Sequence, residues 1–63
     1  MTNSNIVIDH NGNKVAYNVA VSMMDDDIRE DLAREMAPCS NQEFFSAYEV
    51  EHFETYGEFF VVA

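Results

Sequence analysis

The feature that most constrains the fold of this chain is the pair Asn11-Gly12, which separates two segments of alternating apolar and polar residues. An Asn-Gly pair favours a type I′ turn, because both central residues of that turn need a positive φ, and such a turn joins two antiparallel strands. If these two residues form the whole loop, Asp9 lies opposite Lys14 in the hairpin. One face of the hairpin is then apolar and is predicted to face the core; it consists of Ile6, Ile8, Val15, Tyr17, Val19 and Val21.

An amphipathic helix is predicted to follow the hairpin, because from Ser22 the apolar residues recur at every fourth position. Either Ser22 or Asp25 can cap its first turn, and the aspartates at 25–27 place negative charge beside the exposed N–H groups there. Pro38 is expected to end the helix, since the residue before a proline is disfavoured in helical geometry. The predicted apolar stripe consists of Met24, Ile28, Leu32 and Met36.

A second helix is predicted to begin at Ser40, which forms an S-x-x-E capping box with Glu43. Gly57 is expected to end this helix as a left-handed residue. The final segment, residues 58–63, is aromatic and β-branched and therefore predicts a strand. The expected fold is α+β, one domain over residues 1–63 of order ββααβ, with a three-stranded antiparallel sheet packed on two amphipathic helices.

The charge of the chain limits its partners. Twelve acidic residues stand against three basic ones, which gives a formal net charge of −9, and no lysine or arginine follows Arg34. A protein that binds nucleic acid or anionic lipid places cations on phosphates, so this composition disfavours both as direct partners. The same charge attracts basic surfaces, including those of proteins that hold DNA or RNA. Solubility alone is the other explanation for such acidity.

Metal binding and catalysis receive little support from the sequence. Neighbouring residues on a helix point about 100° apart, so the aspartates at 25–27 do not converge on one ion. Cys39, His10 and His52 lack the paired spacings of zinc sites, although a site shared between distant residues or two chains stays open. Cys39 is expected to be a small buried filler and His52 a packed core histidine. No arrangement of a nucleophile with an oxyanion site is visible, so we expect no enzymatic activity and no cofactor.

The sequence also bears on where the protein acts. A single cysteine forms no intramolecular disulfide, and the N-terminus has no recognisable signal segment, which favours the cytoplasm. No apolar run approaches the roughly 20 residues that cross a bilayer, so no membrane association is expected.

The chain carries more apolar side chains than one small core can bury. Val50 and Phe53 fit neither face of the second predicted helix, and the final segment is apolar on both sides. We therefore expect a protein–protein contact, either with a host protein or between two copies in a homodimer. The predicted partner-binding residues are Asp26, Asp27, Glu30, Glu43, Val50, Glu51, Phe53, Glu54, Glu58 and Phe60.

Residues 23–60 resemble a group of very short acidic proteins encoded on phages and other mobile elements of gut bacteria. The motifs that carry the resemblance are M-D-D-D-I-R-E, the turn A-P-C, and Q-E-F-F-x-A-Y with a later Y-G-E-F. These proteins are grouped loosely with anti-CRISPR and anti-restriction proteins. The resemblance implies a host-interacting accessory protein that acts inside the bacterial cell, and it assigns no functional residue.

Three hypotheses follow from these observations. In the first, the acidic residues mimic a phosphate backbone and block a basic nucleic-acid-binding surface of a host defence protein, such as a CRISPR effector, with Val50, Phe53 or Phe60 as apolar anchors. In the second, the chain is a homo-oligomeric accessory or regulatory protein whose acidity only keeps it soluble. In the third, it is a small zinc-binding protein that uses Cys39 with His10 or His52.

Overall fold

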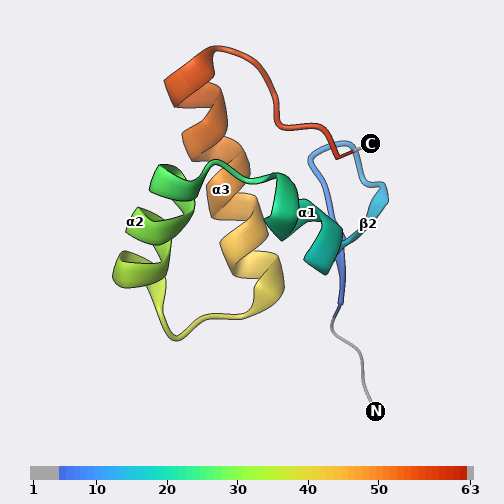
Figure 1. The fold of residues 1–63 in the computed structure, drawn as a ribbon. Coiled ribbons are helices and arrows are strands. Elements are labelled where there is room, and N and C mark those ends of the chain that lie inside the picture. The colour runs from blue at the N-terminus through green and yellow to red at the C-terminus, as the bar shows by residue number, and fades with distance from the viewer. Residues whose placement is uncertain (1–4, 63) are drawn as a thin grey trace.

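The computed structural model of the chain describes residues 5–62 (Figure 1). The elements are β1 (Ile6–Ile8), β2 (Lys14–Ala16), α1 (Tyr17–Met23), α2 (Asp26–Met36) and α3 (Asn41–Tyr56). Helix α3 occupies the middle of the molecule, with α2 on one side and with α1 and the hairpin on the other (Figure 1). The α+β class is confirmed. The predicted single domain also includes residues 1–4 and 63, which lie outside the described residues.

The predicted register of the hairpin is wrong by one residue. Val7 pairs with Val15 rather than with Ala16, and the loop spans residues 10–12. The backbone N–H of Asp9 donates to the carbonyl of Asn13 at 2.9 Å, so Asp9 does not pair with Lys14. Because successive side chains of a strand point to opposite faces, this shift turns β1 over. Val7 is consequently 1% exposed, whereas the predicted core residues Ile6 and Ile8 are 54% and 41% exposed.

The three-residue loop explains the shift. Gly12 has a φ of +85° and donates its N–H to the Asp9 carbonyl at 3.0 Å, which is the arrangement of a turn followed by a left-handed residue. The Asp9 carboxylate accepts hydrogen bonds from the backbone N–H groups of Asn11 and Asn13, at 2.9 and 2.8 Å. These bonds hold the pKa of Asp9 below its usual value, with the bond from Asn13 as the largest cause.

The segment after β2 is a helix rather than a continued strand. Residues Tyr17–Met23 form α1, although Tyr17, Val19 and Val21 were assigned to the second hairpin strand. The same segment also carries a helical stripe, since Tyr17, Ala20, Val21 and Met24 have i, i+3, i+4, i+7 spacing. This stripe faces the core, since Ala20 is fully buried. Val19, which lies off the stripe, is 41% exposed.

The ends of α2 and α3 follow the predicted capping chemistry. Asp25 is the N-cap of α2 and accepts a hydrogen bond from the N–H of Ile28 at 3.2 Å, whereas Ser22 lies within α1. The capping box of Ser40 and Glu43 is present at the start of α3, and Gly57 ends that helix with a φ of +77°. These predictions are confirmed because each depends only on neighbouring residues.

The predicted C-terminal strand is absent from the described residues, so the sheet there has two strands instead of three and the element order is ββααα. Glu58 lies in a bend and residues 59–62 form neither helix nor strand, while Ala63, the last residue of the predicted strand, lies outside the described part. The outer edge of β1 is occupied at Ile8, whose N–H and carbonyl pair with the side-chain amide of Gln42 at 2.7 and 2.9 Å. A third strand therefore cannot pair with Ile8 along this edge.

The core lies between α3 and the other elements. Its buried apolar side chains are Val7, Val15, Ala20, Met24, Leu32, Phe44, Phe45, Tyr48 and Phe60. The predicted stripe of α2 faces this core, because Ile28 and Met36 pack partly against it beside the buried Leu32. Phe60 fixes the C-terminal segment by packing edge-on against Tyr48, with ring centroids 4.7 Å apart.

Candidate partner-binding surface

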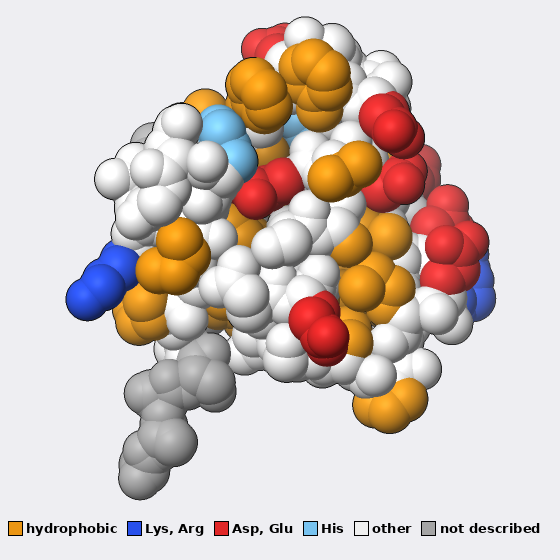
Figure 2. All heavy atoms as spheres, turned by 180° about the vertical axis from the view of Figure 1, so that it is seen from behind, with side chains coloured by type: hydrophobic (Ala, Val, Ile, Leu, Met, Phe, Trp, Pro, Cys, Tyr) orange, Lys and Arg blue, Asp and Glu red, His pale blue; other side chains and the backbone are white. Residues whose placement is uncertain are grey.

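The two acidic helices meet along a shared groove of about 300 Å³. Asp31 and Glu35 line it from α2, and Glu51 lines it from α3. Figure 2 shows acidic side chains in a strip along the edge of the molecule where α2 lies beside α3. Glu51 is a predicted partner-binding residue, whereas Asp31 and Glu35 were not predicted. Helical spacing from Asp27 would have identified both, since residues four and eight positions apart share a face.

All the predicted acidic residues are exposed, but they are not equally available to a partner. Asp26 forms an ion pair with Arg29 at 3.0 Å, and the carboxylate of Glu43 accepts the N–H of Ser40 in the capping box. Arg34 pairs with Asp31. In residues 5–62, the carboxylates without a hydrogen-bond or ion-pair partner are those of Asp27, Glu30, Glu35, Glu51, Glu54 and Glu58.

Asp25 joins the start of α2 to the end of α3. Its Oδ1 atom accepts the hydroxyl of Tyr56 at 2.9 Å, and its backbone N–H donates to the hydroxyl of Tyr48 at 2.7 Å. The hydrogen bond from the Ile28 N–H, followed by that from Tyr56, lowers the pKa of the Asp25 carboxyl. The same contact raises the pKa of Tyr56, because the phenol donates to a carboxylate. These bonds fix how the two acidic helices lie relative to each other.

A buried carboxylate ties the hairpin loop to α3. Glu49 is 8% exposed, and its Oε2 atom accepts the backbone N–H of His10 at 3.1 Å and lies 2.9 Å from Nδ1 of the same residue. The His10 ring stacks on Phe59 with centroids 4.5 Å apart, and Phe59 stacks on Phe53 at 4.7 Å. We call these three stacked rings the aromatic column. The column brings together the hairpin loop, α3 and the C-terminal segment.

The aromatic column borders a groove of about 350 Å³, here called the aromatic groove. Its other lining residues are Ser46, Glu49, Val50 and Glu54, all from α3. The structure thus brings together three predicted partner-binding residues, Val50, Phe53 and Glu54. Hydrophobic side chains are exposed beside the acidic strip (Figure 2).

The prediction that Phe60 is an exposed apolar anchor is wrong. Its side chain is 5% exposed and belongs to the core, so it is not available as an exposed anchor. Phe59 is 54% exposed and stands in the aromatic groove instead. In an extended segment neighbouring side chains point to opposite sides, and the run of apolar residues at 59–62 gave no alternation that would show which side faces inward.

The chain was compared with known protein families. The sequence profile of the family described as Anti-CRISPR protein AcrIC5 matches residues 8–60. The chain belongs to this family. No match was found among curated proteins.

Family membership confirms the resemblance to anti-CRISPR proteins and assigns this AcrIC5 family member an anti-CRISPR role. It implies that the partner is a component of a CRISPR–Cas system and that the protein is an inhibitor acting in the host cell. None of the helices within residues 5–62 is long and apolar enough to cross a membrane.

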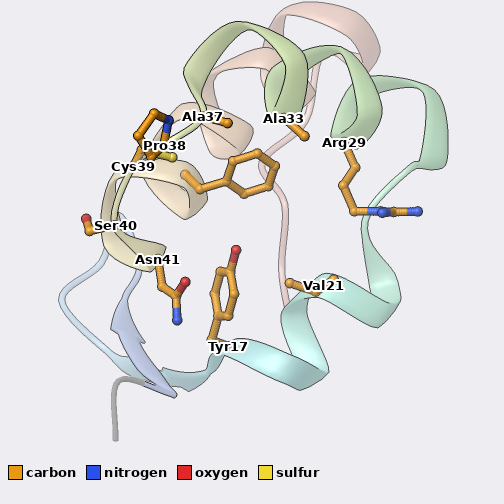
Figure 3. Close-up of a pocket in the computed structure, with 10 residues that line it drawn as sticks. Tyr17, Val21, Arg29, Ala33, Ala37, Pro38, Cys39, Ser40 and Asn41 are labelled. Atoms are coloured by element: carbon orange, nitrogen blue, oxygen red, sulfur yellow. The ribbon is translucent and has the colours of Figure 1, made fainter. Parts of the chain in front are cut away.

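A third hollow, of about 420 Å³, lies between α1, α2 and the turn before α3 (Figure 3). Tyr17 extends into it from the start of α1, and burial raises the pKa of its phenol. Cys39 lines the same hollow and is exposed, which corrects the expectation of a buried filler. No carboxylate lines this hollow, so it is separate from the acidic surface.

The two histidines among the three candidate zinc ligands are engaged in other contacts. His10 is held by Glu49, whereas the Nδ1–H of the half-buried His52 donates to the carbonyl of Glu58 at 3.0 Å. Cys39 lines hollows that neither histidine lines. No group of three metal-ligating side chains converges within the described residues. The packed environment expected for His52 is present, since its ring lies 5.6 Å from Tyr48 and 5.3 Å from Phe60.

Proposed function

We propose that this AcrIC5 family member inhibits a CRISPR–Cas effector by covering a basic, nucleic-acid-binding surface with the acidic residues of α2 and α3. The observation that carries the proposal is the shared groove in which Asp31, Glu35 and Glu51 meet from two helices. Basic surfaces that hold phosphates attract such an arrangement over distances limited by the Debye length, about 10 Å at 0.1 M salt. Inhibition then follows because the covered surface no longer admits nucleic acid.

Apolar contacts supplement the charges. Charged residues at the rim of a protein–protein interface mainly raise the association rate. Most of the affinity comes from a few buried side chains near the centre of the interface. Val50 and Phe53 are 56% and 44% exposed and lie on the same helix as Glu51 and Glu54. A partner that contacts the acidic residues of α3 therefore also reaches these apolar side chains. The protein would act in the bacterial cytoplasm, without contacting nucleic acid itself.

Neutralising part of the acidic surface tests this proposal. The four-site variant carries Asp27→Asn, Glu30→Gln, Glu35→Gln and Glu51→Gln, none of which breaks a hydrogen bond or ion pair of the described residues. A control with Asp26→Asn and Arg29→Gln changes two side chains of α2 but leaves the net charge unchanged. Plasmid-interference assays against a panel of CRISPR–Cas systems first identify an effector that the natural protein inhibits.

Binding to that purified effector is then measured by calorimetry at about 0.05 M and about 0.5 M salt. We expect the natural protein to lose about tenfold or more in affinity at the higher salt, and the four-site variant to bind weakly at both. The paired control should bind like the natural protein. The proposal would be contradicted if the affinity of the natural protein changed less than about twofold between the two salt concentrations and the four-site variant still inhibited the effector. Charge would then not be the basis of inhibition.

The exposed apolar side chains also support a second candidate, self-association through the aromatic groove. Val50, Phe53 and Phe59 are each more than two-fifths exposed. Light scattering across a range of protein concentrations separates the two candidates. A dimer that dissociates on Phe53→Asp would support self-association, while a monomer that still inhibits its effector would exclude it as the basis of function.

A further inference from the structure

We infer that the aromatic groove receives an arginine side chain presented by the CRISPR–Cas partner. The groove is bordered by stacked aromatic rings, its lining is largely apolar, and the exposed Glu54 is one of its lining residues; no lysine or arginine is among them. It therefore combines an apolar wall with the Glu54 carboxylate, which has no partner within the described residues, whereas Glu49 is already held by His10. The inference rests on the proposed function, in that a basic partner surface supplies the arginine.

The chemistry of the lining distinguishes arginine from other occupants. An arginine stem packs along apolar surface, while its planar guanidinium stacks on aromatic rings and pairs with carboxylates. A leucine or methionine would match the apolar lining but would leave the exposed Glu54 beside it without a cationic partner, which an arginine supplies. A lysine would supply charge, but its compact and strongly hydrated ammonium does not stack on a ring as a guanidinium does.

The groove is already formed in the free protein. Glu49 holds the hairpin loop through both the backbone and the ring of His10, and that ring packs on Phe59 with an angle of 18° between the ring planes. Phe53 continues the stack with an angle of 24°. Because these contacts fix the wall before binding, the entering side chain bears little of the ordering cost. The size of the groove suits one side chain better than a large ligand.

The position of Glu54 on α3 places the aromatic groove close to the groove that α2 and α3 share. Glu54 lines the aromatic groove one helical turn after Val50. Glu51, the residue next to Val50 in α3, lines the groove that α3 shares with α2. A basic surface that covers α3 would therefore meet both. One of its arginines would enter the aromatic groove while the others face the unpaired carboxylates.

The test uses the isolated protein and small probes. N-acetyl-arginine amide is titrated into isotopically labelled protein while amide chemical shifts are followed by NMR. N-acetyl-citrulline amide, which has nearly the same shape without the charge, and N-acetyl-leucine amide serve as comparisons. We expect saturable shifts confined to residues around the groove, weak in absolute affinity, with arginine binding at least about threefold more tightly than citrulline or leucine.

Two variants assign the effect to the groove. Glu54→Gln should weaken arginine binding by about threefold or more, and Phe59→Ala should do the same. Glu30→Gln removes one carboxylate outside the groove and should leave the probe affinity within about twofold of the natural protein. Glu54 is exposed and has no partner within the described residues, so its replacement keeps the test valid even if Phe59→Ala perturbs the fold.

Several outcomes would overturn the inference. These are the absence of shifts, equal binding of leucine or citrulline, and shifts scattered over the whole acidic surface. Inhibition that is undiminished in both Glu54→Gln and Phe59→Ala would also overturn it, by showing that the groove lies outside the interface. Because the probe titration needs no effector, failure here is distinct from failure of the acidic-surface proposal, which the four-site variant tests separately.

Discussion

At the scale of single residues, Gly12 fixes the loop that sets the hairpin register. Its φ of +85° lies in the left-handed region, and a Cβ built there would meet no atom within 4 Å. Gly12→Ala should therefore cost about 1 kcal/mol of stability through backbone strain alone. Gly12→Asn should cost less, because asparagine tolerates this conformation better. Urea unfolding followed by circular dichroism measures both, and an alanine variant as stable as the natural protein would contradict the loop assignment.

Asp25 gives a prediction with a defined pH dependence. Its hydrogen bonds from Ile28 and Tyr56 lower its pKa in the folded state below the ordinary 3.8, so folding favours the carboxylate. The resulting stability is present above that value and is lost as the pH falls through the lowered pKa. Asp25→Asn should thus be less stable than the natural protein at about pH 7, with a difference that shrinks toward about pH 2.

Unfolding curves for the natural protein and Asp25→Asn across this pH range measure that difference. Tyr56→Phe is the matched control: it removes one of the donors to Asp25 and should reduce the pH-dependent difference without abolishing it. A difference between the two proteins that stays constant with pH would show that the Asp25 charge does not contribute to stability.

Residue-scale features were predictable from the sequence where neighbours alone decide them. Ser40 and Gly57 were predicted as caps, and Asp25 as one of two alternatives with Ser22, because each cap depends on a few adjacent residues. The hairpin register was not, since Asn11-Gly12 fits both a two-residue loop and a longer loop with a left-handed glycine. A single extra loop residue then reversed which side chains of β1 face the core.

At the scale of elements, the segment Tyr17–Met23 shows where sequence patterns are ambiguous. Its apolar residues satisfy strand alternation through Tyr17, Val19 and Val21, and helical spacing through Tyr17, Ala20 and Val21. Tertiary packing decides between them, because only the helix buries Ala20 and Val15 together in one core. The final segment was misassigned for a related reason: its strand propensity needs a free sheet edge, and Gln42 occupies the edge at Ile8.

Within the described part of the final segment, Phe60 is the side chain that is buried in the core, which leads to a prediction for a matched pair of variants. Phe60 is 5% exposed and packs on Tyr48, whereas the adjacent Phe59 is 54% exposed. Phe60→Ala should cost about 3 kcal/mol of stability, because it leaves a cavity in the core. Phe59→Ala should cost about 1 kcal/mol or less. Urea unfolding of both proteins tests this, and similar losses would imply that the segment is not anchored as described.

At the scale of the whole molecule, the sequence predicted which residues are acidic and exposed but not how they combine. The strip that Asp31, Glu35 and Glu51 form depends on the packing of α2 against α3, which no local pattern specifies. The aromatic groove is similar: Val50 and Phe53 were identified as surplus apolar residues, while His10 and Phe59 reach them only through the fold. Glu49, which had no predicted role, proved to be the buried link to His10.

A net charge of −9 on 63 residues should itself destabilise the folded state, because compaction brings like charges together. Added salt screens this repulsion, so the melting temperature of the natural protein should rise by about 5 °C between about 0.05 M and about 0.5 M sodium chloride. The four-site variant should melt higher at low salt and respond less to added salt. Differential scanning calorimetry measures all four values.

The same comparison separates a functional charge from a solubilising one. If the acidic residues of α2 and α3 serve binding, the four-site variant gains stability while it loses inhibition, since the repulsion that weakens the fold is the charge that attracts the partner. The charge-conserving control with Asp26→Asn and Arg29→Gln should change neither property much, as an exposed ion pair contributes little. A four-site variant that is more stable and inhibits fully would instead leave solubility as the reason for these acidic residues.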